Sequence, residues 1–293
     1  MQWQGQVSCL HERKNNPKYN EPQINTDKKD IYRLPNLVLS KISVYPRSSV
    51  IQKQSQVSLL RSYSMTNLLQ NKTAIITGGS TELAGAVALA LAKNGVSISL
   101  CGRQRDLLEM SETKVKEAGG KVISMVSELD TLEAAEAVVN QTQSAFGGVD
   151  IVILISPFWS GGMIHDHSLK AWDLVMNANL REPFLMARAA LPILREQKHG
   201  EIMAIGSDSS MGIYPQDGAY GVAMHALTTL MELIRVENAD FGIRTHILAP
   251  GVALTNDIDS EGKPALTTSH IAEWIIWLLT RPSHLRGNGP ILI

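Results

Sequence analysis

The sequence predicts an α/β fold, a single domain in which a doubly wound parallel β-sheet carries helices on both faces. Three observations lead to this class. Short β-prone runs alternate with longer helix-forming stretches from residue 73 onward, and glycines separate many of these segments. The chain has 293 residues, 44% of them apolar, which is enough for a large buried core. Strands that alternate with helices in this way form parallel sheets covered on both sides.

The first half of the domain shows the alternation clearly. Residues 73–77 are a β-prone run that ends in a glycine-bearing turn, and residues 83–93 follow as an Ala-rich apolar helix. Residues 96–101 form the next strand. Residues 105–118 form a charged helix, which ends at a pair of glycines. Residues 121–126 form the third strand.

The second half repeats this order with longer helices and no internal repeat. The expected helices cover residues 131–146, 168–195 and 219–241. They alternate with expected strands at residues 150–155, 200–205 and 243–248. A last helix begins near Ser269, and residues 290–293 belong to a final strand.

Residues 1–64 differ from the rest in charge and composition. They hold ten Lys and Arg against four Asp and Glu, and they are rich in Asn, Gln, Ser and Lys. Such a segment buries too little apolar surface to offset its ordering entropy, so we expect a disordered or targeting extension. It is either an organelle transit peptide processed near residues 61–64, or the product of a start codon placed before the natural beginning at Met65. Residues 65–293 form the expected domain.

Composition argues against several classes of function. A formal net charge of -1 argues against a nucleic-acid binder that relies on positive charge. The apolar stretch at residues 271–279 has nine residues and a glutamate, whereas a membrane span needs roughly 20. Two cysteines cannot build a disulfide framework, so we expect a cytoplasmic protein, or a mitochondrial or plastid one if the extension is a transit peptide. His165 and His167 are expected to be surface residues, and no metal site is predicted.

The turn after the first strand is the place where a ligand is expected. Parallel sheets bind ligands at the carboxyl ends of their strands, where the strand order reverses. Gly78 and Gly79 follow the first strand and precede a helix. Glycine lets the backbone approach a pyrophosphate, and the helix N-terminus offers free N–H groups. A glycine pair also occurs in tight turns that bind no ligand. The pair by itself therefore does not distinguish a phosphate-binding turn from a purely structural one.

A series of short motifs resembles the short-chain dehydrogenase/reductase family. Thr77-Gly78 is similar to the start of that family's Thr-Gly-x-x-x-Gly-x-Gly turn. The resemblance extends over residues 71–293, and further landmarks follow in order: Asn179, Ser207, Tyr220 thirteen residues later, and Pro250-Gly251 with Thr255. The resemblance implies a Rossmann-like fold and an NAD(P)-dependent oxidoreductase.

The resemblance also implies a role for each landmark. Ser207 would hold the substrate oxygen, Tyr220 would be the general acid/base, and Asn179 would anchor a proton-relay water, as hydride moves between the nicotinamide and an alcohol/carbonyl substrate. The implied cofactor-binding residues are Thr77, Gly78, Ser80, Arg103, Glu128, Pro250, Gly251 and Thr255. Arg103 lies where the family selects its dinucleotide, and arginine accommodates a 2′-phosphate, so NADP is expected over NAD. A solvated arginine at a strand end is the alternative.

The catalytic motif departs from the family at the residue four after the tyrosine. The family has a lysine there, which lowers the tyrosine pKa by its charge, whereas this chain has Met224. A phenol with a pKa near 10 is a poor base at neutral pH. His225 does not replace the lysine, because at i+5 it points about 140° away from Tyr220. The enoyl reductases of this superfamily have their lysine seven residues after the tyrosine, where this chain has Leu227.

Two further departures concern the cofactor side. Glu82 stands at the second glycine of the phosphate turn, and its carboxylate either takes the anion's place at the helix N-terminus or turns to solvent. The Asn-Asn-Ala-Gly after the family's fourth strand reads Leu-Ile-Ser-Pro at residues 154–157. A short polar loop at residues 256–264 stands where the family has a lid. Candidate apolar contacts to the substrate are Phe158, Trp159 and Met211.

Two functions from different classes remain open. The first is an NADP-dependent oxidoreductase with reduced activity toward an alcohol/carbonyl substrate. The second is a catalytically inactive family member that acts as a ligand-binding or oligomerisation protein. The expected partners are a small-molecule substrate and further copies of the chain. By resemblance, helices 168–195 and 219–241 would pair with a second subunit in a homodimer or homotetramer.

Overall fold

The computed structural model describes residues 68–156, 158–251, 253–254, 266–282 and 290–293. All of these residues belong to one compact unit, Ser64–Ile293. The expectations for residues 1–64 lie outside the described residues.

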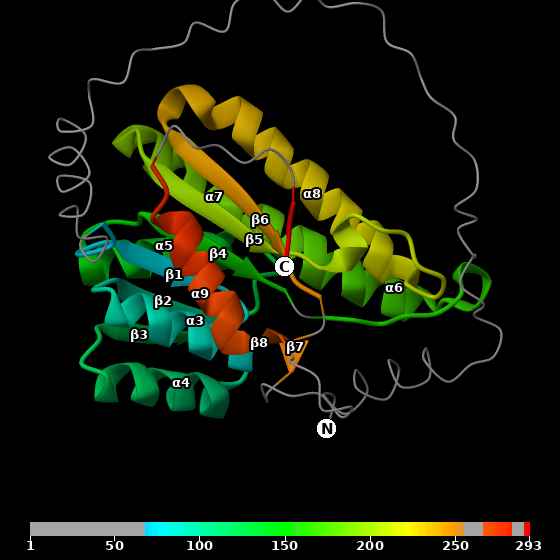
Figure 1. Ribbon diagram of the computed structural model, residues 1–293, viewed down its shortest axis with the longest axis horizontal. Helices are drawn as coiled ribbons and strands as arrows, with labels where there is room; N and C mark the ends of the chain where they lie inside the picture. Colours follow the sequence, from blue (N-terminus) through cyan, green and yellow to red (C-terminus); the bar gives the residue numbers. More distant parts are fainter. Residues whose placement is uncertain (1–67, 157, 252, 255–265, 283–289) are drawn as a thin grey trace, which may run out of the picture. The chain divides into compact units, whose positions relative to one another are not determined.

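In the described part of the chain, seven parallel strands form a sheet in the order β3-β2-β1-β4-β5-β6-β9 (Figure 1). The strands are β1 (Thr73–Ile76), β2 (Ser97–Gly102), β3 (Val122–Val126), β4 (Ile151–Ile155), β5 (Gly200–Ile205), β6 (Ile243–Ala249) and β9 (Ile291–Leu292). A separate parallel pair is formed by β7 (Ala253–Leu254) and β8 (Leu266–Thr267). Every residue of β1 and β4 is buried, as expected for parallel strands with both faces covered.

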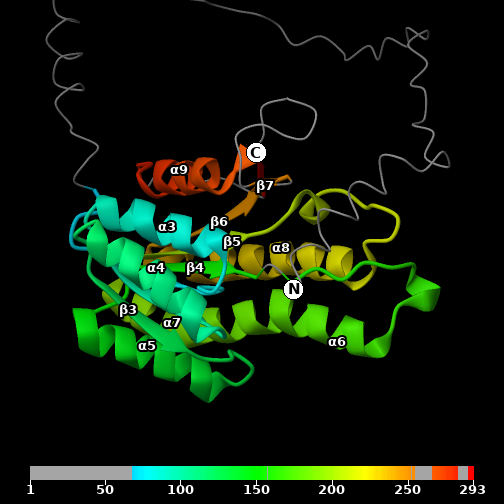
Figure 2. The ribbon, with the colours of Figure 1, turned by 90° about the horizontal axis from the view of Figure 1, so that it is seen from below.

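Helices cover both faces of the sheet (Figure 2). One face carries α3 (Glu82–Lys93), α4 (Arg105–Glu117) and α9 (Thr268–Leu279), and the other carries α5 (Leu132–Phe146), α7 (Glu182–Gln197) and α8 (Gly218–Asn238). Each face has its own apolar cluster. Leu91, Leu100 and Ile275 belong to the first, and Met186 and Leu227 belong to the second. The predicted doubly wound α/β fold is confirmed.

The predicted helix 168–195 is interrupted in the structure. It begins as α6 (Leu169–Met176), passes through five π-helical residues at Asn177–Arg181, and continues as α7. A π-helical turn inserts extra backbone without breaking the apolar periodicity strongly, so the sequence pattern does not reveal it. The insertion places Asn179 inside the protein, where its exposed fraction is 0%.

The strand order reverses at β1. The chain moves outward from β1 to β3 and then returns to the other side of β1 with β4. A ligand crevice is expected outside the carboxyl ends of the strands at this reversal. The segments that follow β1, β2, β4 and β5 all emerge at this edge of the sheet, so they form the candidate site.

Candidate active site

The turn after β1 packs so closely on β4 that glycine is required. Thr77 Oγ1 accepts a hydrogen bond from the Ile155 N–H at 3.0 Å and donates one to the Ile155 carbonyl oxygen at 3.3 Å. Gly78 has a φ of +63°, and a Cβ at this position would lie 2.4 Å from the same carbonyl oxygen. The turn therefore brings backbone, free of side chains, to the carboxyl ends of β1 and β4.

Helix α3 begins at this turn with free backbone N–H groups. Thr81 Oγ1 accepts a hydrogen bond from the Ala84 N–H at 3.2 Å, whereas the N–H groups of Glu82 and Leu83, in the first turn, have no intrahelical partner. The Glu82 side chain is exposed, and its carboxylate accepts a hydrogen bond from Thr268 Oγ1 at 3.4 Å. Of the two positions expected for Glu82, the structure shows the one in solvent, next to α9.

Ser80 joins the turn after β1 to the turn after β2. Its Oγ accepts a hydrogen bond from the Gln104 N–H at 2.9 Å and donates one to the Gln104 carbonyl oxygen at 3.3 Å. A Cβ on Gly102 would lie 2.6 Å from Ser80 Oγ, so the two turns are in close contact. Two segments predicted to bind the cofactor are therefore neighbours at the sheet edge.

Arg103 forms an ion pair, although its side chain is 46% exposed. Its guanidinium donates a hydrogen bond to the carboxylate of Glu182, the first residue of α7. Burial raises the pKa of Glu182, Arg103 opposes this shift, and the carboxylates of Glu128 and Asp130 add to it. The predicted residues Arg103 and Glu128 thus lie in one electrostatic neighbourhood. Glu182 is 79 residues from Arg103 in sequence, and no motif pointed to it.

Ser207 and Tyr220 lie next to each other, as the catalytic prediction requires. Ser207 follows β5 and caps a short 3₁₀ turn, and Tyr220 is near the start of α8. The Ser207 hydroxyl is close enough to the phenol to favour the ionised form of Tyr220. The same hydroxyl donates a hydrogen bond to Asp208 Oδ1 at 2.7 Å. Asp208 was not singled out in the sequence, although it is adjacent to a predicted catalytic residue.

The surroundings of Tyr220 keep its phenol protonated. Burial, with a smaller contribution from the carboxylates of Asp208 and Asp217, raises the pKa of Tyr220 to about 12, against the opposing effect of Ser207. Met224 brings no charge to this region, since its side chain is 1% exposed and belongs to the apolar cluster under α8. A phenol in this state is an acid and not a base at neutral pH.

Asn179 reaches the segment after β4 from the π-helical turn. Its Nδ2 donates a hydrogen bond to the Phe158 carbonyl oxygen at 2.6 Å, so this segment supports Asn179 without the Asn-Asn-Ala-Gly sequence of the family. Asn179 Oδ1 is buried and has no hydrogen-bond partner among the described residues. An unpartnered buried acceptor is costly, and a bound water or ligand would satisfy it.

The remaining predicted residues are only partly placed. The Gly251 N–H donates a hydrogen bond to the Ile293 carbonyl oxygen at 3.2 Å, which fixes the segment with Pro250 after β6. Thr255 and the polar loop at 256–264 lie outside the described residues. His225 bonds the Gly221 carbonyl oxygen at 2.9 Å within its own helix.

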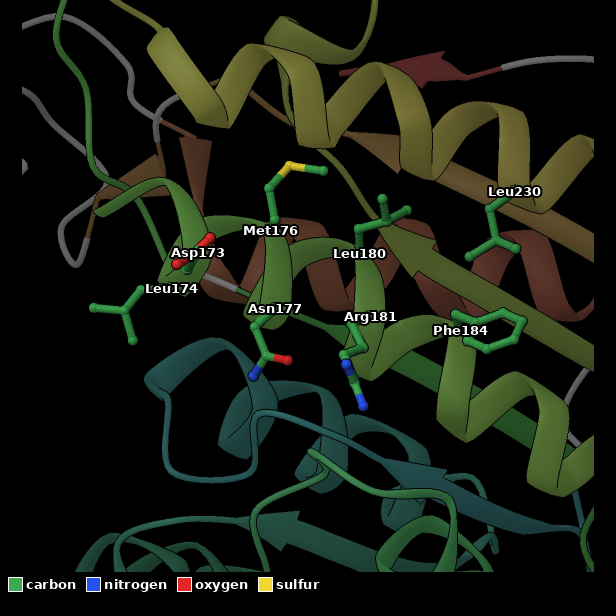
Figure 3. A pocket seen from close by; sticks show the side chains of 8 residues that line it. All are labelled: Asp173, Leu174, Met176, Asn177, Leu180, Arg181, Phe184 and Leu230. Carbon is green, nitrogen blue, oxygen red and sulfur yellow. The ribbon is translucent and has the colours of Figure 1, made fainter. Parts of the chain in front are cut away.

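An apolar groove of about 850 Å³ runs between α8 and the stretch from α6 to α7 (Figure 3). Its lining residues are Asp173, Leu174, Met176, Asn177, Leu180, Arg181, Phe184 and Leu230. Neither Ser207 nor Tyr220 lines this groove. Of these lining residues, Leu174 and Phe184 are 46% and 42% exposed, which leaves apolar surface for a partner.

Two other kinds of site were sought in the described residues. No group of His, Cys, Asp and Glu there has the arrangement to hold a metal ion. In the same part of the chain, every helix is too short or too polar to cross a membrane.

Comparison with known families gives a match over most of the domain. A family model described as short chain dehydrogenase matches residues 72–263. An uncharacterized oxidoreductase of Staphylococcus aureus is 27% identical over 224 residues, which are 75% of this chain and 96% of that protein. A short chain dehydrogenase of Pseudocercospora fijiensis is 31% identical over 185 residues, 62% of this chain and 60% of that protein.

Solved structures show the same fold. An alcohol dehydrogenase from the archaeon Thermococcus sibiricus, complexed with 5-hydroxy-NADP, is 26% identical with a TM-score of 0.67, and the match covers 76% of this chain and 95% of that one. A metagenomic short-chain oxidoreductase in complex with NADP is 24% identical with a TM-score of 0.67, and covers 78% and 98% of the two chains.

Proposed function

This chain belongs to the short-chain dehydrogenase/reductase family and is an oxidoreductase, and from this premise we propose that it transfers hydride between NADP(H) and a small alcohol/carbonyl substrate. The observation that carries the proposal is the Ser207–Tyr220 hydroxyl pair at the carboxyl edge of the sheet. This pair is on the same edge as the glycine turn after β1. One edge thus offers a place for a dinucleotide and a proton donor for a carbonyl oxygen.

The residues present fit a nicotinamide dinucleotide, whose nicotinamide supplies or accepts the hydride when bound. Gly78, Thr77 and Ser80 would hold its pyrophosphate side, where the start of α3 offers N–H groups. Arg103 supports NADP over NAD, because a guanidinium binds a 2′-phosphate through two N–H groups. Glu128 would lie on the adenine side, and Pro250, Gly251 and Thr255 would complete the nicotinamide side.

Tyr220 is the proposed proton donor. With a pKa of about 12 the phenol is protonated throughout the neutral range, so the chain is suited to carbonyl reduction. Ser207 would position the substrate oxygen, and Asn179 Oδ1 would hold a water that returns the proton to Tyr220. Without a lysine at Met224, no cation lowers the tyrosine pKa, and we propose that turnover is slow for this family.

We further propose that the chain is a homodimer or homotetramer. The groove between α8 and the stretch from α6 to α7 is apolar, and its lining includes the exposed side chains of Leu174 and Phe184. Two copies that pair through these helices would cover this surface.

A fluorescence titration with NADPH tests the proposed function. We expect saturable binding, and a Met224→Lys variant with higher carbonyl reductase activity than the parent. Gly78→Val places a branched side chain against the Ile155 carbonyl oxygen and should abolish binding. If the parent and a Glu82→Gly variant both fail to bind NADPH at millimolar concentration, the proposed hydride transfer with NADP(H) is wrong, and this result favours a non-catalytic role.

A further inference from the structure

The partner of Arg103 is a half-buried carboxylate on a distant helix. Glu182 begins α7, and its side chain is 17% exposed, whereas that of Arg103 is 46% exposed. A buried carboxylate needs a positive partner, because transfer from water is costly without one. Arg103 supplies that charge, so its guanidinium has a protein partner where the proposed function requires a cofactor phosphate.

More negative charge surrounds the pair. Glu128 and Asp130, in the segment that follows β3, lie close enough to Glu182 to raise its pKa. Cys101, at the end of β2, faces Glu182 as well, and burial together with this carboxylate raises the pKa of its thiol to about 12, so it stays neutral. Glu182 thus faces one cation, two carboxylates and a neutral thiol. These groups come from β2 and from the segments that follow β2 and β3.

A 2′-phosphate that approaches Arg103 therefore meets a competitor. Arg103 and Glu182 together carry no net charge, so a phosphate gains little attraction while the ion pair is intact. The phosphate and the Glu182 carboxylate are like charges, and such charges about 4 Å apart repel by up to ~4 kcal/mol at an effective dielectric constant of 20. To bind Arg103, the phosphate has to draw the guanidinium away from Glu182. The half-buried Glu182 carboxylate then lies near the carboxylates of Glu128 and Asp130 without this positive partner.

We propose that Glu182 sets the dinucleotide selectivity of this chain: it competes with the 2′-phosphate for Arg103, and it becomes more protonated when the phosphate binds. The inference rests on the proposed function, since it requires that a dinucleotide binds beside Arg103. It assigns a selectivity role to a residue outside the loop that follows β2. Protonation lowers the negative charge of the carboxylate that has lost its partner.

The inference predicts a pH dependence that NADH does not share. Arg103 holds the pKa of Glu182 down, and burial with Glu128 and Asp130 pushes it up. When the phosphate draws Arg103 away, only the raising effects remain, so the bound state holds more protons than the free state. NADPH affinity should therefore increase as the pH falls from 8 toward about 6, below which the phosphate begins to lose its own second charge.

The experiment compares NADPH and NADH binding to the parent, Glu182→Gln and Glu196→Gln by titration calorimetry. Glu196 is an exposed residue near the other end of α7, so its variant removes the same charge from the same helix. We expect Glu182→Gln to tighten NADPH at least about tenfold at pH 7.5 and to change NADH less than about threefold. Titrations in two buffers of different ionisation enthalpy should show proton uptake with NADPH for the parent and Glu196→Gln but not for Glu182→Gln.

A double variant keeps the test decisive if Glu182→Gln folds poorly. In an Arg103→Gln background there is no guanidinium to compete for, so adding Glu182→Gln should change the ratio of NADPH to NADH affinity much less than it does in the parent. If the parent binds both dinucleotides and Glu182→Gln leaves their ratio and the proton uptake as in the parent, this inference is wrong and the proposed function stands. If the folded parent binds neither dinucleotide, both are overturned.

Discussion

Replacing Asp208 with Asn removes a negative charge beside the Ser207–Tyr220 pair and should lower the pKa of Tyr220. The parent value of about 12 lies two units above that of a free phenol, so at any pH below 10 the phenolate is about 100-fold rarer than in an unperturbed tyrosine. Burial is the largest cause of the shift and remains in the variant. The variant pKa should therefore fall between 12 and 10, with a rise in phenolate of less than about 100-fold.

The assay is a ¹³C NMR titration of tyrosine-labelled protein, in which Tyr220→Phe identifies the signal. Asp106→Asn is the control, because it removes an equal charge from an exposed position on α4. The same linkage acts on stability. A folded-state pKa above the unfolded one gives stability that is complete below pH 10 and is lost as the pH rises toward 12. A parent Tyr220 that titrates at 10 or below, or a pKa that Asp208→Asn leaves unchanged, would refute this reasoning.

Three further predictions follow from the same structure. Gly78→Ala should lower the free energy of urea unfolding by about 1–3 kcal/mol more than Gly119→Ala does. Both glycines have a positive φ, but a Cβ at Gly78 would clash with the Ile155 carbonyl oxygen, whereas a Cβ at Gly119 would meet open space. Equal losses of stability would contradict this. Phe184→Glu should shift the mass measured by light scattering toward the monomer, whereas Phe146→Glu at the end of α5 should not. Met224→Lys should lower the melting temperature in the absence of dinucleotide, since it buries a charge in an apolar cluster, and a variant as stable as the parent would show that the lysine reaches solvent.

The secondary structure could be predicted from the sequence because local signals determine it. Apolar runs such as β4 and capped helices such as α3 depend on nearby residues, so their bounds in the structure differ little from those expected. The π-helical turn at Asn177–Arg181 was missed, because it changes the helical period over only a few residues.

The candidate site was harder to predict, because its side chains pair between segments that are far apart in the sequence. Arg103 and Glu182 are 79 residues apart, and Glu82 and Thr268 are 186 apart. Such pairs depend on which helix starts meet at the sheet edge, and a motif within one segment carries no information about that. Ser207 and Tyr220 were predicted as neighbours only through the family resemblance. Asp208 is next to Ser207 in the sequence, so its place beside this predicted residue could be seen. Its effect on the pKa of Tyr220 could not, because that effect depends on the fold.

A crystal structure of the chain grown with NADPH tests the central claim most directly. The account predicts electron density for the dinucleotide across the carboxyl ends of β1 and β2, with its pyrophosphate over Gly78, its 2′-phosphate on Arg103, and its nicotinamide ring facing the hydroxyl groups of Ser207 and Tyr220. Side chains that fill this edge of the sheet, or a dinucleotide bound elsewhere, would contradict the assignment of this edge as the hydride-transfer site.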